Sequence, residues 1–248
     1  MLLHGLAERW QVFSRLLPLL TPHLRTVAID LPGFGASPAL PDGGFDLGAV
    51  CRRVEAVVAE LRLERPAMLG HSLGGGVAVR YASERQGALR ALALLAPAGL
   101  IATGAVRPSW RRPRVHAAGR VLTRLATPLV ASRALRERAF SRVVGDPAGL
   151  DAALARELAQ GASHGRSTPA AGIEIVYAGL RDRLDALTLP TLVIWGERDR
   201  IVSPSFAEPL RDALPDGRLL LLPGAGHVPM VEAPAAVAAA VMELLADA

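Results

Sequence analysis

Ser72 has the neighbours that a nucleophilic serine requires. The chain reads Gly70-His71-Ser72-Leu73-Gly74 between a short apolar run and a helix-like pattern. This spacing matches G-x-S-x-G, in which a strand, a tight turn and a helix present a serine hydroxyl. Gly70 and Gly74 lack side chains that would clash where strand and helix meet. The helix that follows would point its N-terminal amides toward a developing oxyanion. The pattern therefore predicts nucleophilic catalysis by Ser72.

The elements that must hold this turn alternate along the chain. Besides the run before Ser72, apolar runs typical of strands lie at Met1–Leu3, Arg25–Asp30, Leu89–Ala96, Thr191–Trp195 and Arg218–Leu222. Apolar residues at helical spacing lie at Ala7–Leu20, Leu47–Leu63, around Phe206–Leu214 and at Ala235–Leu245. Alternating strands and helices predict an α/β fold with a mostly parallel sheet covered on both faces.

The alternation stops between Pro97 and about Leu187. This stretch is helical in tendency, is interrupted by prolines and contains no convincing strand. It predicts a helical insertion at residues 98–187, with the α/β core formed by residues 1–97 and 188–248.

Composition excludes several classes of function. The single cysteine, Cys51, allows no internal disulfide and no multi-cysteine metal site, and its place on a helical face predicts a buried thiol. All 28 basic residues are arginine, so Schiff-base and phosphate-loop lysines are absent. No run reaches the ~18 apolar residues of a membrane-spanning helix, and charges within Met1–Trp10 argue against a secretory signal. We expect a cytoplasmic enzyme that uses no metal or cofactor.

The chain resembles the α/β-hydrolases of the esterase, epoxide-hydrolase and C–C-hydrolase group. Besides the serine turn, the motifs that carry the resemblance are His4-Gly5, Asp30-Leu31-Pro32-Gly33-Phe34-Gly35-Ala36-Ser37, Trp195-Gly196-Glu197-Arg198-Asp199 and Gly224-Ala225-Gly226-His227. They follow the family order of serine, acid and histidine. The resemblance covers the chain outside the insertion, which would be the family's lid, and it implies an α/β-hydrolase fold.

A serine nucleophile needs a histidine base, and His227 is the best candidate. The six histidines are His4, His23, His71, His116, His164 and His227. His227 follows Gly-Ala-Gly behind the last expected strand, at the edge where an α/β sheet gathers catalytic groups. The side chain of His71 should diverge from the neighbouring Ser72 hydroxyl across the turn. The resemblance places His4 in the loop beside the oxyanion and gives it a structural role.

The resemblance also selects the acid and the oxyanion donors. The family's Gly-x-x-Asp spacing picks Asp199 over its neighbour Glu197, and the alternative position in Ala96–Gly99 has no carboxylate. Asp30 lies among turn formers and is interpreted as a turn-holding residue. The backbone amides of Leu73 and Leu6 would bind the oxyanion.

The predicted function is hydrolysis of a carboxylic ester or related acyl bond through an acyl-enzyme. Serine at position 72 points away from dehalogenases and epoxide hydrolases, which use aspartate there. The alternatives are a C–C-bond hydrolase of aromatic meta-cleavage products, an acyltransferase or perhydrolase on the same triad, and an inactive truncated hydrolase-fold protein. Ala96–Leu100 faintly resembles the C–C hydrolases, but His71 stands where they often have asparagine, and Val228 replaces a tryptophan.

The insertion is strongly basic. Between Ala98 and Gly145 a single acid, Glu137, accompanies ten arginines: Arg107, Arg111, Arg112, Arg114, Arg120, Arg124, Arg133, Arg136, Arg138 and Arg142. Such a surface could attract an anionic substrate, an acyl carrier or an acidic membrane, but a solvated charged face is the favoured interpretation. No module that reads nucleic acid is found.

The sequence starts close to its first motif. Relatives carry two strands and a complete third before His4-Gly5, whereas here only Met1–Leu3 precede it. Either the start of the chain is misassigned or truncated, or the fold survives with a shortened sheet, and both alternatives bear on the positioning of Leu6.

Overall fold

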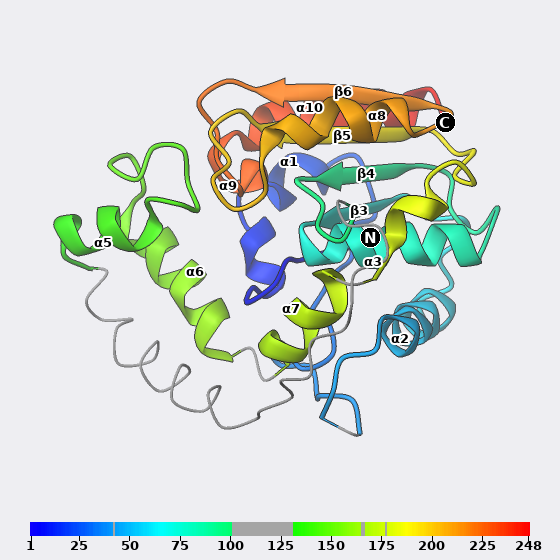
Figure 1. The fold of residues 1–248 in the computed structure, drawn as a ribbon, viewed down its shortest axis with the longest axis horizontal. Coiled ribbons are helices and arrows are strands. Elements are labelled where there is room, and N and C mark those ends of the chain that lie inside the picture. The colour runs from blue at the N-terminus through cyan, green and yellow to red at the C-terminus, as the bar shows by residue number, and fades with distance from the viewer. Residues whose placement is uncertain (42, 101–130, 165–166, 177) are drawn as a thin grey trace.

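A parallel sheet is the centre of the computed structural model (Figure 1), which describes residues 1–41, 43–100, 131–164, 167–176 and 178–248. Within these ranges its strands are β1 (Leu2–Leu3), β2 (Ala28–Ile29), β3 (Met68–His71), β4 (Leu92–Leu95), β5 (Thr191–Gly196) and β6 (Gly217–Leu222). Their order is β2-β1-β3-β4-β5-β6, and every neighbouring pair is parallel. The predicted α/β fold with a mostly parallel sheet is confirmed.

Helices follow the strands along the chain. The α-helices among the described residues are α1 (Leu17–Leu20), α2 (Leu47–Glu60), α3 (Leu73–Glu84), α5 (Arg133–Phe140), α6 (Ala152–His164), α7 (Thr168–Val176), α8 (Ala207–Asp212), α9 (Pro229–Glu232) and α10 (Pro234–Ala246). Short 3₁₀ helices are η1 (Trp10–Phe13), η3 (Leu180–Arg183) and η4 (Pro204–Phe206). No described helix has the length and apolar character needed to cross a membrane.

Alternate strand residues face two separate cores. Leu94 and Val193 pack with α2, α3 and α8 on one face of the sheet. Their neighbours Leu95 and Ile194 pack with η1, α1 and α10 on the other face. Because side chains alternate along a strand, both faces of each central strand are apolar, as expected for a sheet covered on both sides.

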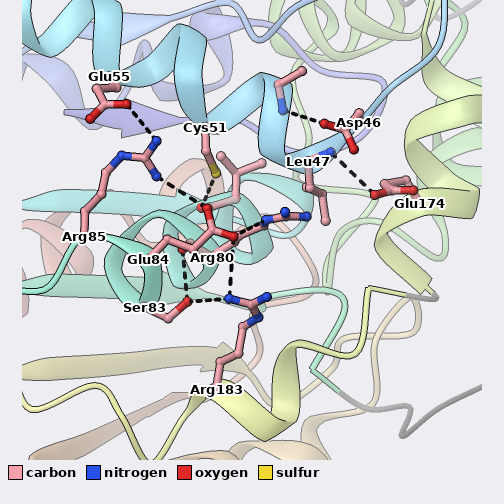
Figure 2. Close-up of polar contacts among 12 residues, drawn as sticks. Asp46, Leu47, Cys51, Glu55, Arg80, Ser83, Glu84, Arg85, Glu174 and Arg183 are labelled. Atoms are coloured by element: carbon pink, nitrogen blue, oxygen red, sulfur yellow. Dashed lines mark hydrogen bonds and ion pairs between the residues drawn. The ribbon is translucent and has the colours of Figure 1, made fainter.

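Polar contacts cap α2 and link α2, α3 and η3 to one another (Figure 2). Asp46 caps α2 by accepting the Ala49 N–H at 2.6 Å. Arg85, just after α3, binds Glu55 of α2 at 2.7 Å, and Arg183 of η3 lies 3.6 Å from Glu84. These partly exposed ion pairs each contribute little to the stability of the fold. The buried apolar side chains of α3 therefore contribute most of the stability of this helix in the fold.

The expectation of one helix over Ala7–Leu20 is wrong. The structure has η1, a turn and then α1, which begins at Leu17 with Pro18 in its first turn. Proline has no N–H to donate to the preceding turn, so it starts a helix rather than continuing one. The expected strand at Arg25–Asp30 is likewise reduced to β2, two residues at the edge of the sheet.

The described residues between β4 and β5 contain α5, α6, α7 and η3 and no strand. Figure 1 shows α5 and α6 on the side toward which the arrowheads of β4 and β6 point. Ile175 of α7 joins the core on the α3 face, whereas Leu154 of α6 joins the opposite core. Six of the ten arginines singled out in the sequence fall in residues 101–130, outside the described residues.

Candidate active site

Ser72 sits in a strained turn between β3 and α3. Its backbone dihedrals are φ 48° and ψ −112°, a conformation that costs a non-glycine residue free energy. The Ser72 N–H donates to the Leu95 carbonyl at 2.9 Å, and the Ser72 carbonyl accepts from the Ala98 N–H at 2.9 Å. These contacts fix the turn to the end of β4 and to the residues after it.

The glycines around Ser72 have the role predicted from the sequence. A Cβ atom on Gly70 would overlap the Gly74 carbonyl oxygen, and a Cβ on Gly74 would overlap the Leu3 carbonyl oxygen. Both obstacles are backbone atoms, which cannot rotate away as a side chain could. The close approach of β3, α3 and β1 therefore depends on glycine at these two positions.

We expect Gly74→Ala to lower the free energy of unfolding by about 2–3 kcal/mol, a typical cost of overpacking a tight site. Urea denaturation of the purified variant would measure the change. Gly87→Ala is the matched control, because its Cβ would meet nothing within 4 Å while its φ of 78° carries only the left-handed strain. Equal destabilisation of the two variants would contradict this account of the turn.

Asp199 and His227 form a buried pair. Asp199 follows β5 and His227 follows β6, and the His227 Nδ1–H donates to Asp199 Oδ2 at 2.7 Å. The same oxygen accepts from Trp195 Nε1 at 3.2 Å. The other oxygen accepts the Ile201 and Val202 amides at 2.8 and 3.0 Å. The carboxylate is therefore held rigidly and is fully hydrogen-bonded.

This pairing sets the tautomer of the His227 ring. A carboxylate only accepts hydrogen bonds, so Nδ1 carries the proton and Nε2 keeps its lone pair as a base. The residue before Ser72 contacts this ring: the ring centroid of His71 lies 4.9 Å from that of His227. Among the described residues, the Ser72 hydroxyl makes no hydrogen bond. The structure thus pairs two of the three predicted residues directly and places the third in the adjoining turn.

The main chain of His227 is held from both sides. Its N–H donates to the Val143 carbonyl at 2.8 Å, and its carbonyl accepts from His71 Nε2 at 2.7 Å. Glu232 of α9 accepts the Gly226 N–H at 2.9 Å and the Gly145 N–H at 2.7 Å. Burial raises the pKa of the Glu232 carboxyl group. The His227 loop is therefore bound to residues 143–145, which follow α5.

The loop after β1 carries the predicted oxyanion donor Leu6. Neither Leu6 N–H nor Leu73 N–H has an acceptor within the described ranges, so both amides are free to bind one. Ala7 has a φ of 59°, which marks a tight turn directly after Leu6. A Cβ on Gly161 of α6 would lie 2.8 Å from the Ala7 carbonyl oxygen. The helical segment thus packs closely on this loop.

Three further expectations from the sequence, for His4, Asp30 and Cys51, are confirmed. His4 is buried, accepts the Leu31 N–H through Nε2 at 2.9 Å, and contacts the Gly5 carbonyl through Nδ1. Asp30 accepts the Trp10 and Ala36 amides at 2.8 and 2.9 Å and so holds its turn. Cys51 is buried, and burial raises the pKa of its thiol to about 12.

The sequence did not reveal Glu8, Glu232 or Val143 as part of this region. Each of the three has a partner far along the chain, which no local spacing signals: His71 for Glu8, Gly145 for Glu232 and His227 for Val143. The sequence also indicates no hydrogen-bond partner for His71. In the structure its buried ring contacts Glu8 at 2.9 Å and the His227 carbonyl at 2.7 Å.

The comparisons with known proteins agree with this architecture. A family model described as the alpha/beta hydrolase fold matches residues 1–234. The chain therefore belongs to the α/β-hydrolase fold family.

Individual relatives include esterases and other hydrolases. The chain is 30% identical to a pimeloyl-(acyl-carrier protein) methyl ester esterase from Chromobacterium violaceum, with 93% of the chain and 87% of the relative covered. It is 37% identical to an epoxide hydrolase from Mycobacterium tuberculosis over 73% of the chain and 86% of the relative. An esterase from Exiguobacterium antarcticum has a similar structure, with a TM-score of 0.76, 22% identity, and 98% and 89% coverage.

One similar protein is considerably longer. The chain is 30% identical to the dihydrolipoyllysine-residue acetyltransferase component of an acetoin cleaving system from Pseudomonas putida. That match covers 87% of the chain but spans only 55% of the relative's length.

Proposed function

We propose that this α/β-hydrolase is a serine hydrolase that cleaves a carboxylic ester or related acyl bond. The observation that carries the proposal is the buried Asp199–His227 pair, 2.7 Å apart, beside the strained turn that holds Ser72. A nucleophile, a base and a carboxylate that orients the base are the parts that acyl transfer needs.

In the proposed reaction, Ser72 Oγ attacks the carbonyl carbon of the substrate while His227 Nε2 accepts the hydroxyl proton. The Leu6 and Leu73 amides donate to the oxyanion of the tetrahedral intermediate. His227 then returns the proton to the leaving alcohol, and an acyl-enzyme remains on Ser72. Water, deprotonated by His227, then attacks this ester. The bond to Ser72 Oγ breaks, His227 returns the proton to that oxygen, and the acid is released.

We also propose that residues 98–187 form a lid over this site. Support comes from contacts of the helical segment with two of the catalytic loops. Val143 accepts the His227 N–H at 2.8 Å, and a Cβ on Gly172 of α7 would lie 3.4 Å from Leu6. A lid that excluded water would favour acyl transfer over hydrolysis, so the same residues could serve an acyltransferase.

The serine at position 72 favours an ester over an epoxide as the substrate. The name of the relative from Chromobacterium violaceum describes a methyl ester esterase. The relative from Mycobacterium tuberculosis is named an epoxide hydrolase, but epoxide opening in this family uses an aspartate nucleophile and position 72 is serine. An ester substrate is therefore the proposal that fits the side chain present.

The experiment that tests this function combines turnover with covalent labelling. Purified protein would be assayed on nitrophenyl esters of short and long acyl chains, with styrene oxide as the epoxide and a vinylogous diketone as the C–C substrate. A fluorophosphonate would then label the protein, and the modified peptide would be identified by mass spectrometry. We expect ester turnover that stops as Ser72 is labelled. Label on another residue, or turnover that survives complete labelling, would refute the proposal.

A further inference from the structure

Glu8 and His71 connect three loops that the proposed chemistry uses. His71 comes directly before Ser72, and its Nε2 donates to the His227 carbonyl at 2.7 Å. Its Nδ1 lies 2.9 Å from Glu8 Oε2. The same carboxylate oxygen accepts the Gly5 N–H at 2.6 Å, in the loop that carries Leu6. One carboxylate thus binds the oxyanion loop directly and, through His71, the His227 loop.

The hydrogen-bond partners of His71 and Glu8 restrict where the protons of these two side chains lie. A carbonyl only accepts, so His71 Nε2 must carry a hydrogen. If Nδ1 were bare, its lone pair would face a carboxylate oxygen that already accepts the Gly5 N–H. A hydrogen between Nδ1 and Glu8 Oε2 removes this repulsion. The raised pKa of His71 and the lowered pKa of Glu8 place that hydrogen on Nδ1, so the ring is an imidazolium paired with a carboxylate.

The surroundings are consistent with a charged pair. The His71 side chain is fully buried and that of Glu8 is 12% exposed. Burial opposes charge on both groups, but their mutual attraction, together with the hydrogen bonds to the His227 carbonyl and the Gly5 N–H, outweighs it. The pKa of His71 is therefore raised and the pKa of Glu8 is lowered. The other titratable groups that face the pair are His4, Asp199 and the His227 ring. Asp30 lies behind His4, 4.0 Å from its Nε2.

We propose that Glu8 and His71 are positioning residues. Their buried ion pair fixes the His227 main chain and the loop that carries Leu6 in place relative to Ser72. The proposal rests on the serine-hydrolase function proposed above. His227 can take the Ser72 proton only if its ring stays within hydrogen-bond reach, and a misplacement of about 1 Å can cost 10²-fold in rate. Neither Glu8 nor His71 contacts the reacting atoms in this scheme.

The variant Glu8→Gln tests the pair sharply, because the Gly5 N–H and His71 Nδ1 meet at one carboxylate oxygen. If the glutamine placed its oxygen there, His71 Nδ1 would keep its hydrogen, but the neutral ring would then lack one on Nε2 for the His227 carbonyl. If the glutamine placed its NH₂ there, the amide would oppose the Gly5 N–H. Either arrangement loses one of the three hydrogen bonds.

We expect Glu8→Gln to lower kcat for ester hydrolysis by about 10- to 100-fold and to change KM by less than about threefold, because the pair positions the base rather than the substrate. The matched control is Glu55→Gln, which removes the carboxylate paired with Arg85 at 2.7 Å, at the end of α3 away from Ser72. It should keep the wild-type kcat. A Glu8→Gln kcat within twofold of wild type, or a loss confined to KM, would overturn the proposal.

A second measurement needs neither turnover nor a variant. In wild-type protein labelled with ¹⁵N-histidine at pH 7.5, about one unit above the usual histidine pKa of ~6.5, we expect one ring protonated on both nitrogens, assigned to His71 by nuclear Overhauser contacts with the His227 ring. A neutral His71 at that pH would overturn the ion pair. If the protein hydrolysed no ester, the proposed function would fail, while this spectrum would still decide the state of the pair.

Discussion

Replacing Ser72 with alanine is expected to lower kcat for ester hydrolysis by about 10⁵-fold or more, the scale seen when a triad nucleophile is removed. The variant has no oxygen to form the acyl-enzyme, so only binding and the oxyanion donors would remain to assist attack by water. Alanine keeps the backbone hydrogen bonds of the turn to Leu95 and Ala98, both 2.9 Å long. The fold should therefore survive the substitution.

The measurement is single-turnover and steady-state hydrolysis of a nitrophenyl ester by wild type and Ser72→Ala, together with circular dichroism of both proteins. Ser205→Ala is the control, since the Ser205 hydroxyl is exposed and bonded to Ser203 at 2.8 Å. That variant should match wild type. Ester hydrolysis retained by a folded Ser72→Ala protein would show that Ser72 is not the nucleophile.

The three predicted catalytic residues share one property. Each lies in the loop after a strand, and the apolar run of that strand can be recognised in the local sequence. Ser72 follows β3, Asp199 follows β5 and His227 follows β6. Parallel strands bring their carboxyl ends to one edge of the sheet, so correct strand positions already place the loops that carry these residues at that edge. The direct contact between Asp199 and His227 follows from that topology.

What the sequence could not predict depends on contacts across the chain. Glu8 and His71 are separated by 63 positions, and their pairing follows from the way the loop after β1 folds against the serine turn. The break of the expected helix just before Pro18 could be inferred from the sequence, since proline in a helix interior removes a hydrogen bond. The apolar spacing around it nevertheless suggested one continuous element. Periodicity reports which residues are buried and not where a short helix ends.

The change Asp199→Asn is expected to lower kcat by about 10³- to 10⁴-fold, close to what the same change causes in other catalytic triads. Asparagine can donate its NH₂ to His227 Nδ1, which would move the ring proton to Nε2. Nε2 would then face Ser72 as a donor and could not accept its proton. The amides of Ile201 and Val202 can still donate to the asparagine oxygen, as they do to Asp199 at 2.8 and 3.0 Å. The loss should therefore come from the tautomer and not from a collapsed loop.

Glu197→Gln is the matched control for Asp199→Asn. Glu197 lies in the same loop, two residues earlier, and was the rival acid in the sequence, but its side chain is exposed whereas Asp199 is buried. Steady-state kinetics on a nitrophenyl ester should show an unchanged Glu197→Gln enzyme beside an almost inactive Asp199→Asn enzyme with a similar KM. If Glu197→Gln lost the activity instead, the carboxylate that orients His227 during turnover would have to come from the exposed side of this loop, after a rearrangement of the buried pair.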